Sequence, residues 1–394
     1  MSRSPRSGIL AGGNWIVDHV KTLDAWPPQD ALANITAESW GNGGSPYNIL
    51  KNLSKLGASC PLAGIGLVGA DADGARILDD CRAHRIDTTQ LRTTPAAPTS
   101  YSDVMTDSQT GRRTFFHQRG ANALLAPEHF DFTTPQAAAA KIFHIGYILL
   151  LDKLDEPAAD AAVQSLESGV SDYRPAASVQ SSDIPAFPSL PADNFKPQTL
   201  NSRLARSAPA AIPRICDVLR RARAAGLLTS LDCVSENSDR FQTIVRPVLP
   251  EVDILFVNDF EAGKLTGIDL HTTGKLNRAD VERAVRAIVD LGVRRQVVFH
   301  APEAACAASP DGSLHWQPSL RVPSAAIKGT AGAGDAFAAG VLYGLHEDWP
   351  IADSLRLGVC TAAACLGSPT CSDSIPSLQE TLGLAEIYGF RVLA

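Results

Sequence analysis

The chain has 394 residues, of which 45% are hydrophobic and 20% charged, a balance typical of globular proteins with a large buried core. Its formal net charge is −7 and it has no long run of lysine and arginine, which argues against nucleic acid or an anionic membrane as the main partner. No apolar segment approaches the ~20 residues of a membrane helix, and the N-terminus has no signal-peptide pattern, so we expect a cytoplasmic protein.

Short apolar runs alternate with amphipathic stretches along most of the chain, which is the pattern of a parallel sheet covered by helices. The expected strands are residues 62–68, 141–151, 227–233, 254–258 and 296–300. The expected helices are residues 73–84, 214–225, 280–291, a segment after Asp335, and residues 351–366. This alternation predicts an α/β fold with a mainly parallel central sheet.

Two regions break the alternation. Residues 14–40 and 99–117 show β-type alternation without helices, and a turn at 108–111 predicts a hairpin. These strands, in about 14–42 and 99–120, are expected to form a small sheet that stands off the main one and serves as a lid. Residues 168–213 are rich in Ser, Pro and Ala with almost no apolar periodicity, so we interpret them as a low-complexity surface insertion.

Eight cysteines are scattered along the sequence and form no C-x-x-C pair. In a chain of this size without an export signal, we expect reduced thiols, several of them buried. The cysteines therefore predict neither a disulfide framework nor a thiolate metal site.

A glycine-rich segment, Gly64 to Gly69, matches the G-x-G-x-x-G pattern of dinucleotide-binding proteins. The match is weak, because the apolar run continues through Val68 and the turn residues come only at 69–74. The sequence contains no P-loop motif, no H-E-x-x-H, no nucleophile elbow and no histidine cluster with metal-ligand spacing. An oxidoreductase built on this segment is the weakest of the alternatives.

The most informative segment runs from Ile327 to Phe337, Ile-Lys-Gly-Thr-Ala-Gly-Ala-Gly-Asp-Ala-Phe, and an apolar helical pattern follows it. Glycines let backbone N–H groups crowd around an anion, and a helix N-terminus adds about half a positive charge. A carboxylate beside a phosphate makes sense as a base, so Asp335 is a candidate to deprotonate a hydroxyl that attacks the phosphate. The alternative is an ordinary glycine-rich turn with an Asp in the first helical turn.

Four short motifs precede this segment along the chain, at residues 13–18, 41–48, 69–74 and 258–261. Together with Gly-Ala-Gly-Asp they resemble the PfkB/ribokinase family of carbohydrate and nucleoside kinases, over nearly the whole chain apart from the insertion. The resemblance implies a single catalytic domain over residues 1–394. Its fold would be a ribokinase-like three-layer α/β/α sandwich with a mainly parallel central sheet and a small β-sheet lid.

The resemblance also implies which residues bind the substrate. Asp18 corresponds to a carboxylate that accepts hydrogen bonds from sugar hydroxyls at the C-terminal end of a strand. Gly43 and Gly44 correspond to the pair that lets the backbone approach the sugar, and Asn48 to a polar group that clamps a hydroxyl. A solvated acid at a strand end, and a turn followed by a polar residue early in a helix, are the alternatives.

At the catalytic end, the resemblance implies that Asp335 is the base. Gly332, Ala333 and Gly334 would contribute to the anion hole that stabilises charge on the transferring phosphoryl group. Thr330, together with Gly332 and Gly334, would contact the nucleotide. The implied nucleotide is ATP.

Asn258 and Glu261 correspond to residues that organise Mg²⁺ and the triphosphate, mostly through water; a capped helix start is the alternative. The usual family motif has an acid where this chain has Gly329 and a second threonine where it has Ala331. In potassium-activated relatives that acid and threonine help to ligate a monovalent cation, so K⁺ is a doubtful cofactor here. With the Lys328 ammonium as a substitute charge, we hypothesise that the protein does not need K⁺.

Two other local features bear on the ligands. Where relatives usually have a Thr-x-Gly stretch that touches the nucleotide, residues 299–303 read Phe-His-Ala-Pro-Glu, so the nucleotide contact must differ there. Arg112, Arg113 and Arg119 lie in or near the lid hairpin and would meet an acidic substrate or phosphate, although an exposed hairpin arginine is usually solvated.

We therefore interpret the sequence as an ATP-dependent carbohydrate kinase that transfers the γ-phosphoryl group to a sugar hydroxyl. An adenosine-type nucleoside kinase is the alternative within the enzyme class, and Trp15, Trp40 and Phe116 would offer the apolar slab for its purine. A catalytically inactive regulator that binds sugar or nucleotide is the alternative outside it. The lid sheets of such kinases often pair, which suggests a homodimer through the lid.

Overall fold

The computed structural model describes residues 6–158, 212–368 and 370–393. The chain divides into two compact units, residues 1–156 with 212–394, and residues 157–211. The fold and site below belong to the first unit. The low-complexity insertion expected at 168–213 lies outside the described residues, apart from its last two positions.

The first unit is built on a sheet of nine strands in the order β15-β14-β13-β10-β9-β8-β1-β4-β5. The pairs from β13 to β5 are parallel, whereas β14 runs antiparallel to both of its neighbours. The bounds of these strands are β1 (Ile9–Gly13), β4 (Leu62–Gly69), β5 (Ile86–Thr94), β8 (Ile142–Ile148), β9 (Leu228–Cys233), β10 (Ile254–Asn258), β13 (Gln296–His300), β14 (Ala304–Ala308) and β15 (Leu314–Pro318).

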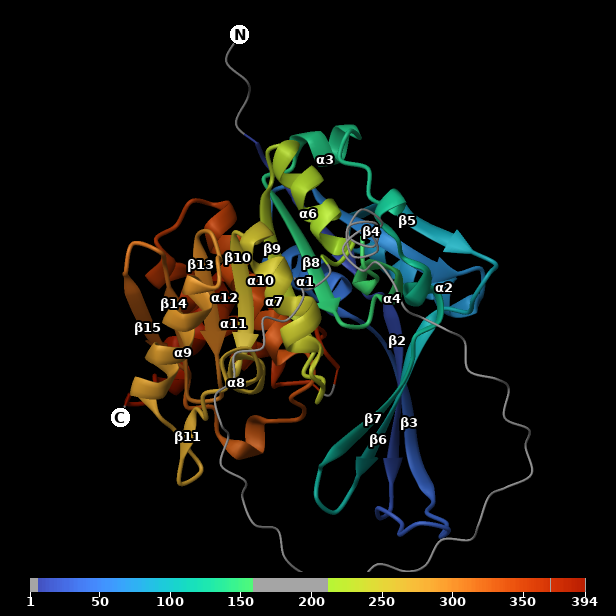
Figure 1. The fold of residues 1–394 in the computed structure, drawn as a ribbon. Coiled ribbons are helices and arrows are strands. Elements are labelled where there is room, and N and C mark those ends of the chain that lie inside the picture. Colours follow the sequence, from blue (N-terminus) through green and yellow to red (C-terminus); the bar gives the residue numbers. More distant parts are fainter. Residues whose placement is uncertain (1–5, 159–211, 369, 394) are drawn as a thin grey trace, which may run out of the picture. The chain divides into compact units, whose positions relative to one another are not determined.

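Helices cover both faces of this sheet, as the sequence pattern predicts (Figure 1). One face carries α1, α2, α10 and α11, with α12 packed on α11; the other carries α3, α6, α7, α8 and α9. Their bounds are α1 (Ser45–Leu56), α2 (Ala72–Ala83), α3 (Pro135–Ala139), α4 (Asp152–Asp155), α6 (Ile215–Ala224), α7 (Arg246–Val248), α8 (Asp259–Thr266), α9 (Arg278–Asp290), α10 (Ala333–His346), α11 (Ile351–Cys365) and α12 (Leu378–Tyr388).

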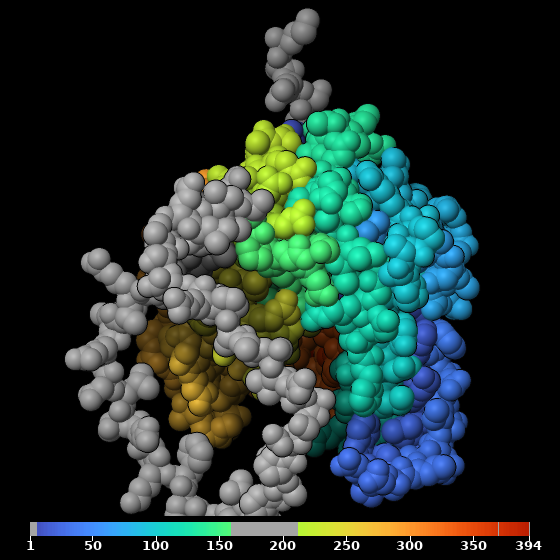
Figure 2. Space-filling view, turned by 45° about the vertical axis from the view of Figure 1, so that its right-hand side comes forward, coloured from blue at the N-terminus to red at the C-terminus, as the bar shows by residue number. Residues whose placement is uncertain are grey.

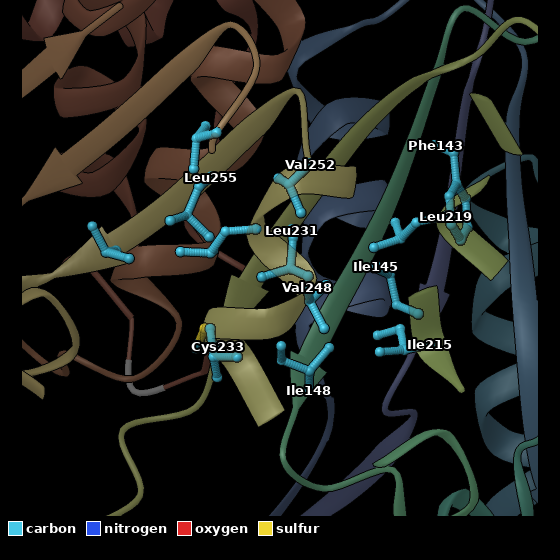
Figure 3. Close-up of a cluster of buried hydrophobic side chains, with 14 of the residues drawn as sticks. Phe143, Ile145, Ile148, Ile215, Leu219, Leu231, Cys233, Val248, Val252 and Leu255 are labelled. Carbon is cyan, nitrogen blue, oxygen red and sulfur yellow. The ribbon is translucent and has the colours of Figure 1, made fainter. Parts of the chain in front are cut away.

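Alternate residues of the central strands feed the two cores. In β10, Leu255 and Val257 join the core under α6 and α9, whereas Ile254 and Phe256 join the core under α1 and α10. Figure 3 shows part of the first core, where side chains of β8 and β9 meet those of α6. Burial on both faces explains why these strands read as continuous apolar runs.

A second sheet of four strands in the order β3-β2-β6-β7 forms the lid, and Figure 1 shows it extending away from the main sheet. β2 pairs antiparallel with β3 and parallel with β6, and β6 and β7 form the expected hairpin. The bounds are β2 (Ile16–Leu23), β3 (Ile35–Gly43), β6 (Ser100–Asp107) and β7 (Arg113–Gln118). A third, two-stranded sheet consists of β11 (His271–Thr272) and β12 (Lys275–Leu276).

The expected strand over 141–151 is shorter than the apolar run. Tyr147 and Leu149 adopt φ angles of 58° and 84°, and the register with β9 shifts between Ile145 and Ile148. Because such angles are unusual for residues with a side chain, the backbone leaves the sheet here although the sequence stays apolar. This turn brings Tyr147 into the site described below.

The weak dinucleotide pattern has a packing explanation. Gly64 and Gly66 lie inside β4. A Cβ atom on Gly64 would lie 2.7 Å from a ring atom of Trp15, and a Cβ atom on Gly66 would lie 2.3 Å from another. Trp15 is fully buried and donates its ring N–H to the Ile65 carbonyl at 2.8 Å. These glycines therefore make room for an indole, not for a pyrophosphate.

All eight cysteines carry free thiols, and all but Cys60 are buried. Among the helices that the structure describes, none is long and apolar enough to span a bilayer.

Candidate active site

A cavity of about 570 Å³ lies between the lid, the C-terminal ends of β8, β9 and β10, and the start of α10. Figure 2 views the molecule from the side of the lid, and red atoms of the last part of the chain are visible between the teal hairpin and the yellow to brown segments. Ligands of open α/β sheets bind at this edge, where the strand order changes direction. The cavity is therefore the candidate site.

Asp335 lies at the floor of this cavity in the first turn of α10. Gly332 is the N-cap of the helix, with a left-handed φ of 74°, and a Cβ there would come within 2.5 Å of Cys371 Cβ. The N–H groups of Gly334 and Asp335 belong to the first helical turn and have no intrahelical acceptor. Thr330, Gly332, Ala333 and Gly334 all line the cavity, so the glycine segment presents its backbone to it.

Two side chains hold the carboxylate of Asp335. Asn48 Nδ2 donates to Asp335 Oδ2 at 2.7 Å, and the Tyr147 hydroxyl donates to the same oxygen at 3.0 Å. Asp335 is 4% exposed, and this burial raises its pKa to about 7, with a further contribution from the negative charge of Asp232. A carboxyl with a pKa near neutrality is suited to accept a proton and release it again.

Asp232, at the end of β9, is a site residue that sequence reasoning missed. Its carboxylate accepts from Ser45 Oγ at 2.5 Å and from the Tyr147 backbone N–H at 2.7 Å, and it lies 3.4 Å from His144 Nε2. Asp232 thus fixes the turn that carries Tyr147 toward Asp335. The one sequence signal was an acid at the C-terminal end of a buried strand.

Asp18 lies on the lid side of the cavity, across from Asp335. Burial raises the pKa of Asp18 to about 6, and the positive charge of Arg113 opposes that rise. Gly43 is required beside it, because a Cβ at that position would stand 2.6 Å from Asp18 Oδ2. Gly44 has a φ of 92°, and a Cβ there would overlap the Asn14 carbonyl oxygen at 1.9 Å. The glycine pair therefore allows the lid strand and α1 to approach the site closely.

The lid presents mixed chemistry to the cavity. Ser102 of β6 and Phe115 and His117 of β7 line it, and Ser102 Oγ lies 3.1 Å from His117 Nδ1. Because side chains alternate along a strand, Arg113 shares the face of Phe115 and His117. Arg113 is half-buried and forms no ion pair with another described residue, which distinguishes it from Arg119.

Arg119, by contrast, has a structural role. It pairs with Asp152 at 2.6 Å and donates to the Leu149 carbonyl at 3.0 Å, so it is committed to the turn after β8. Arg112 is exposed at the hairpin end. Of the three arginines near the lid, Arg113 is thus the half-buried one that has no ion-pair partner among the described residues.

Two buried asparagines of the cavity wall carry polar atoms without a protein partner among the described residues. Both side-chain amide atoms of Asn14 and the Oδ1 atom of Asn48 are buried and form no hydrogen bond. Both residues line the cavity between Asp18 and Asp335. Since an unpaired buried polar atom costs about 1–3 kcal/mol, these atoms favour a ligand rich in hydroxyl groups or ordered water.

Asn258 and Glu261 form the capping box of α8 and also line the cavity. Asn258 Oδ1 accepts the Glu261 N–H at 2.9 Å, and Glu261 Oε2 accepts the Asn258 N–H at 3.1 Å. Ser235 joins them, receiving a bond from Asn258 Nδ2 and donating to Glu261 Oε1 at 3.0 Å. Asn258 and Glu261 therefore cap α8 and line the cavity at the same time.

These residues suit a Mg²⁺ ion that they contact through its water molecules, not one that they coordinate directly. Burial raises the pKa of Glu261 to about 7, and the charge of Asp232 adds to that rise. The oxygens of Glu261 are already engaged in the cap, and no group of three or more His, Cys, Asp or Glu side chains in the described part of the chain could hold a metal. A Mg²⁺ ion that keeps its water molecules fits this site, because the carboxyl groups of Glu261 and Asp232 would attract its charge without direct coordination.

A second cavity of about 350 Å³ adjoins the first. Its walls include the apolar side chains of Leu320, Val322, Phe337, Val359 and Leu366. Such a slot suits an aromatic base more than a phosphate.

His300, at the end of β13, borders both cavities. Its ring lies 5.1 Å from the ring of Phe337, and a Cβ on Gly334 would stand 3.1 Å from His300 Cε1. Burial lowers the pKa of His300 to about 4, so the imidazole is neutral near pH 7.

The sequence offers Lys328 as a substitute charge for a monovalent cation, and Trp15, Trp40 and Phe116 as a purine slab in the nucleoside-kinase alternative. Lys328 is exposed. Trp15 is fully buried in the core, and Trp40 and Phe116 are about half exposed and absent from the cavity walls. Phe115, the neighbour of Phe116, is the lid aromatic that faces the cavity.

Solved structures share this fold. The ribokinase of Arabidopsis thaliana, in complex with ribose and ATP, is 19% identical with a TM-score of 0.68, over 96% of this chain and 98% of that one. A probable sugar kinase from Rhizobium etli is 21% identical with a TM-score of 0.67, over 98% and 100%. The architecture is therefore that of the ribokinase-like class of α/β proteins.

The chain belongs to the pfkB family of carbohydrate kinases, whose model matches residues 13–192 and 213–378. A 5-dehydro-2-deoxygluconokinase of Geobacillus kaustophilus is 33% identical over 103 residues, 26% of this chain and 30% of that protein. The probable chloroplastic fructokinase-6 of Arabidopsis thaliana is 29% identical over 195 residues, 49% of this chain and 47% of that protein. The matched stretches thus span less than half of either relative.

Proposed function

We propose that this protein is an ATP-dependent carbohydrate kinase that transfers the γ-phosphoryl group of ATP to a sugar hydroxyl, with Asp335 as the base. One observation carries the proposal: the buried carboxylate of Asp335 lies beside the free N–H groups at the start of α10, at the floor of the cavity of about 570 Å³. A base and an anion cradle at the same point are what in-line phosphoryl transfer to an alcohol requires.

In this proposal the sugar lies between Asp18 and Asp335. The Asp18 carboxylate accepts hydrogen bonds from hydroxyl groups, and the unpartnered amide atoms of Asn14 and Asn48 offer further bonds. The attacking hydroxyl gives its proton to Oδ1 of Asp335, because Asn48 and Tyr147 both occupy Oδ2. The first-turn N–H groups of α10 stabilise the charge that develops on the phosphoryl oxygens.

Magnesium bound with ATP would neutralise part of the phosphate charge. Glu261 and Asn258 would hold its water molecules, in keeping with the engagement of their own oxygens in the cap of α8. The lid would close over the sugar and exclude water from the transfer.

The acceptor is proposed to be a sugar or a sugar acid. The partial relatives are named for 5-dehydro-2-deoxygluconate and fructose as acceptors, and Arg113 offers a half-buried cation near Asp18 for a carboxylate. A purine slab built from Trp15, Trp40 and Phe116 has no support from their positions, which disfavours the adenosine-type alternative.

The test is release of ADP from Mg·ATP with a panel of sugars, sugar acids and nucleosides, using an Asp335→Asn variant as the blank. We expect one sugar or sugar acid to drive ADP release that the variant lacks. Release with nucleosides alone would favour the adenosine-type kinase. Binding of sugar and nucleotide without any release would favour an inactive regulator.

A homodimer through the lid is a further part of the proposal. The outward face of the lid carries Trp40 and Phe116, each 52% exposed. Exposed aromatic side chains on a sheet face favour pairing with a second copy. Light scattering would distinguish a dimer from a 41.7 kDa monomer, and Trp40→Ser with Phe116→Ser should shift a dimer to the monomer.

A further inference from the structure

His300 lies at the junction of the two cavities. The residues that line both of them are Asn258, His300, Thr330, Ala333 and Gly334. In the register of the main sheet, His300 pairs with Asn258 on one side and with Ala305 on the other, so strand pairing fixes its backbone. Its ring lies against the first turns of α10, near Gly334 and Phe337.

If the proposed function holds, the base of the nucleotide lies in one cavity and its terminal phosphate in the other. The apolar cavity suits the base, and the transferring phosphoryl group must reach Asp335 in the polar one. The intervening phosphates must then pass the junction. A nucleotide bound in this way has its α- or β-phosphate next to the ring of His300.

The donors at this junction are few. None of its residues is a lysine or arginine, and one of the two N–H groups of Asn258 Nδ2 already donates to Ser235. The second Asn258 N–H, the Thr330 hydroxyl, the N-terminal N–H groups of α10 and the His300 ring are left. A neutral imidazole has one N–H to donate, and neither ring nitrogen of His300 bonds to another described residue.

We propose that His300 binds the nucleotide by donating its ring N–H to a non-bridging oxygen of the α- or β-phosphate. The inference rests on the proposed function, since it assumes an adenine nucleotide. It also accounts for the departure at residues 299–303, where Pro302 has no backbone N–H to offer a phosphate. A side-chain donor at position 300 would supply a hydrogen bond that Pro302 cannot.

The test measures binding of adenosine, ADP and Mg·AMP-PNP to the full chain by calorimetry, without any sugar. His300→Leu removes the donor and keeps an apolar side chain against Phe337. We expect it to weaken binding of ADP and Mg·AMP-PNP by about tenfold or more, and to leave adenosine binding unchanged. His300→Asn and His300→Gln, which restore an N–H near one or the other ring nitrogen, should recover part of the loss in at least one case.

Two controls keep the outcome informative. His315→Leu, at an exposed position of β15 outside both cavities, should bind all three ligands like the wild type. The ¹³Cε1 resonance of His300 should move on addition of Mg·AMP-PNP and not on addition of adenosine. That signature does not depend on any substitution, so a variant that fails to fold leaves the proposal testable.

Equal loss of adenosine and Mg·AMP-PNP in His300→Leu would overturn the proposal, because it would assign His300 to packing around the base. Unchanged binding of all three would overturn it as well. If the wild type binds sugars and no adenine nucleotide, the proposed function itself fails and the role of His300 with it. If the wild type binds Mg·AMP-PNP and His300→Leu binds it equally, only the role of His300 fails.

Discussion

Replacing Tyr147 by phenylalanine removes one of the two hydrogen bonds to Asp335 Oδ2 and leaves the ring in place. The lost bond is 3.0 Å long and reaches a carboxylate, for which about 1.5–3 kcal/mol is typical. The hydroxyl stabilises the charged form of Asp335, so its loss raises the pKa of Asp335 above about 7. At 1.36 kcal/mol per unit, we expect a rise of about one to two units.

The sign of the pH effect follows from the role of Asp335 as a base. Activity requires the carboxylate, so kcat/KM falls as the pH drops through the pKa of Asp335, near 7 in the wild type. In Tyr147→Phe this acid limb moves to higher pH. At pH 6 the variant should be about tenfold or more below the wild type, and the gap should close in alkaline solution.

Other titratable groups near Asp335 interact with its charge. Asp232 and Asp18 raise its pKa, and the buried thiols of Cys365 and Cys371 lie near enough to sense its charge. Burial raises the pKa of both thiols far above the acid limb, whereas Asp18, with a pKa of about 6, titrates within that limb in both the wild type and the variant.

The assay is the pH profile of kcat/KM with the best acceptor from the substrate panel. Tyr343→Phe is the matched control, since Tyr343 lies on the same helix as Asp335 and outside the cavity. A uniform loss of activity with an unmoved acid limb would refute the reasoning, because it would show that Tyr147 only supports the fold.

Three further outcomes are expected. Gly43→Ala pushes a methyl group against Asp18, so it should lower kcat/KM for the sugar by up to roughly 10²-fold and leave the nucleotide affinity unchanged. Gly41→Ala is its control: the space around Gly41 is open, so this variant should be neutral in the same assay. Exchange of Na⁺ for K⁺ should leave the rate unchanged, since position 329 has no carboxylate, and a several-fold rise would contradict this. Gly66→Ala forces a Cβ against Trp15 and should cost about 1–3 kcal/mol of unfolding free energy in urea titrations; an unchanged midpoint would exclude the packing role.

The local part of this site could be predicted from the sequence. A glycine-rich turn directly before an apolar helix leaves the first-turn N–H groups free to bind an anion, so Asp335 and its neighbours could be proposed from adjacent residues alone. The capping box of Asn258 and Glu261 is equally local, and the structure contains it. The lid followed from strand alternation without helices.

The partners of Asp335 could not be predicted, because they depend on the fold. Tyr147 is 188 positions away from Asp335 and Asn48 is 287 positions away, and only the strand order brings them together. Tyr147 was hidden further by an apolar run that reads as an uninterrupted strand, whereas its backbone turns out of the sheet. Asp232 depends likewise on where β9 ends relative to β8.

The central claim is that Asp335 removes the proton from the acceptor hydroxyl, and Asp335→Asn tests it most directly. Asparagine keeps the shape of the side chain and an oxygen for the Tyr147 hydroxyl, but it cannot take up the proton. With nucleotide and sugar binding measured separately on the same variant, we predict retained affinity for both and a kcat reduced by about 10²–10⁴-fold. Retained affinity with a near-normal kcat would contradict the account.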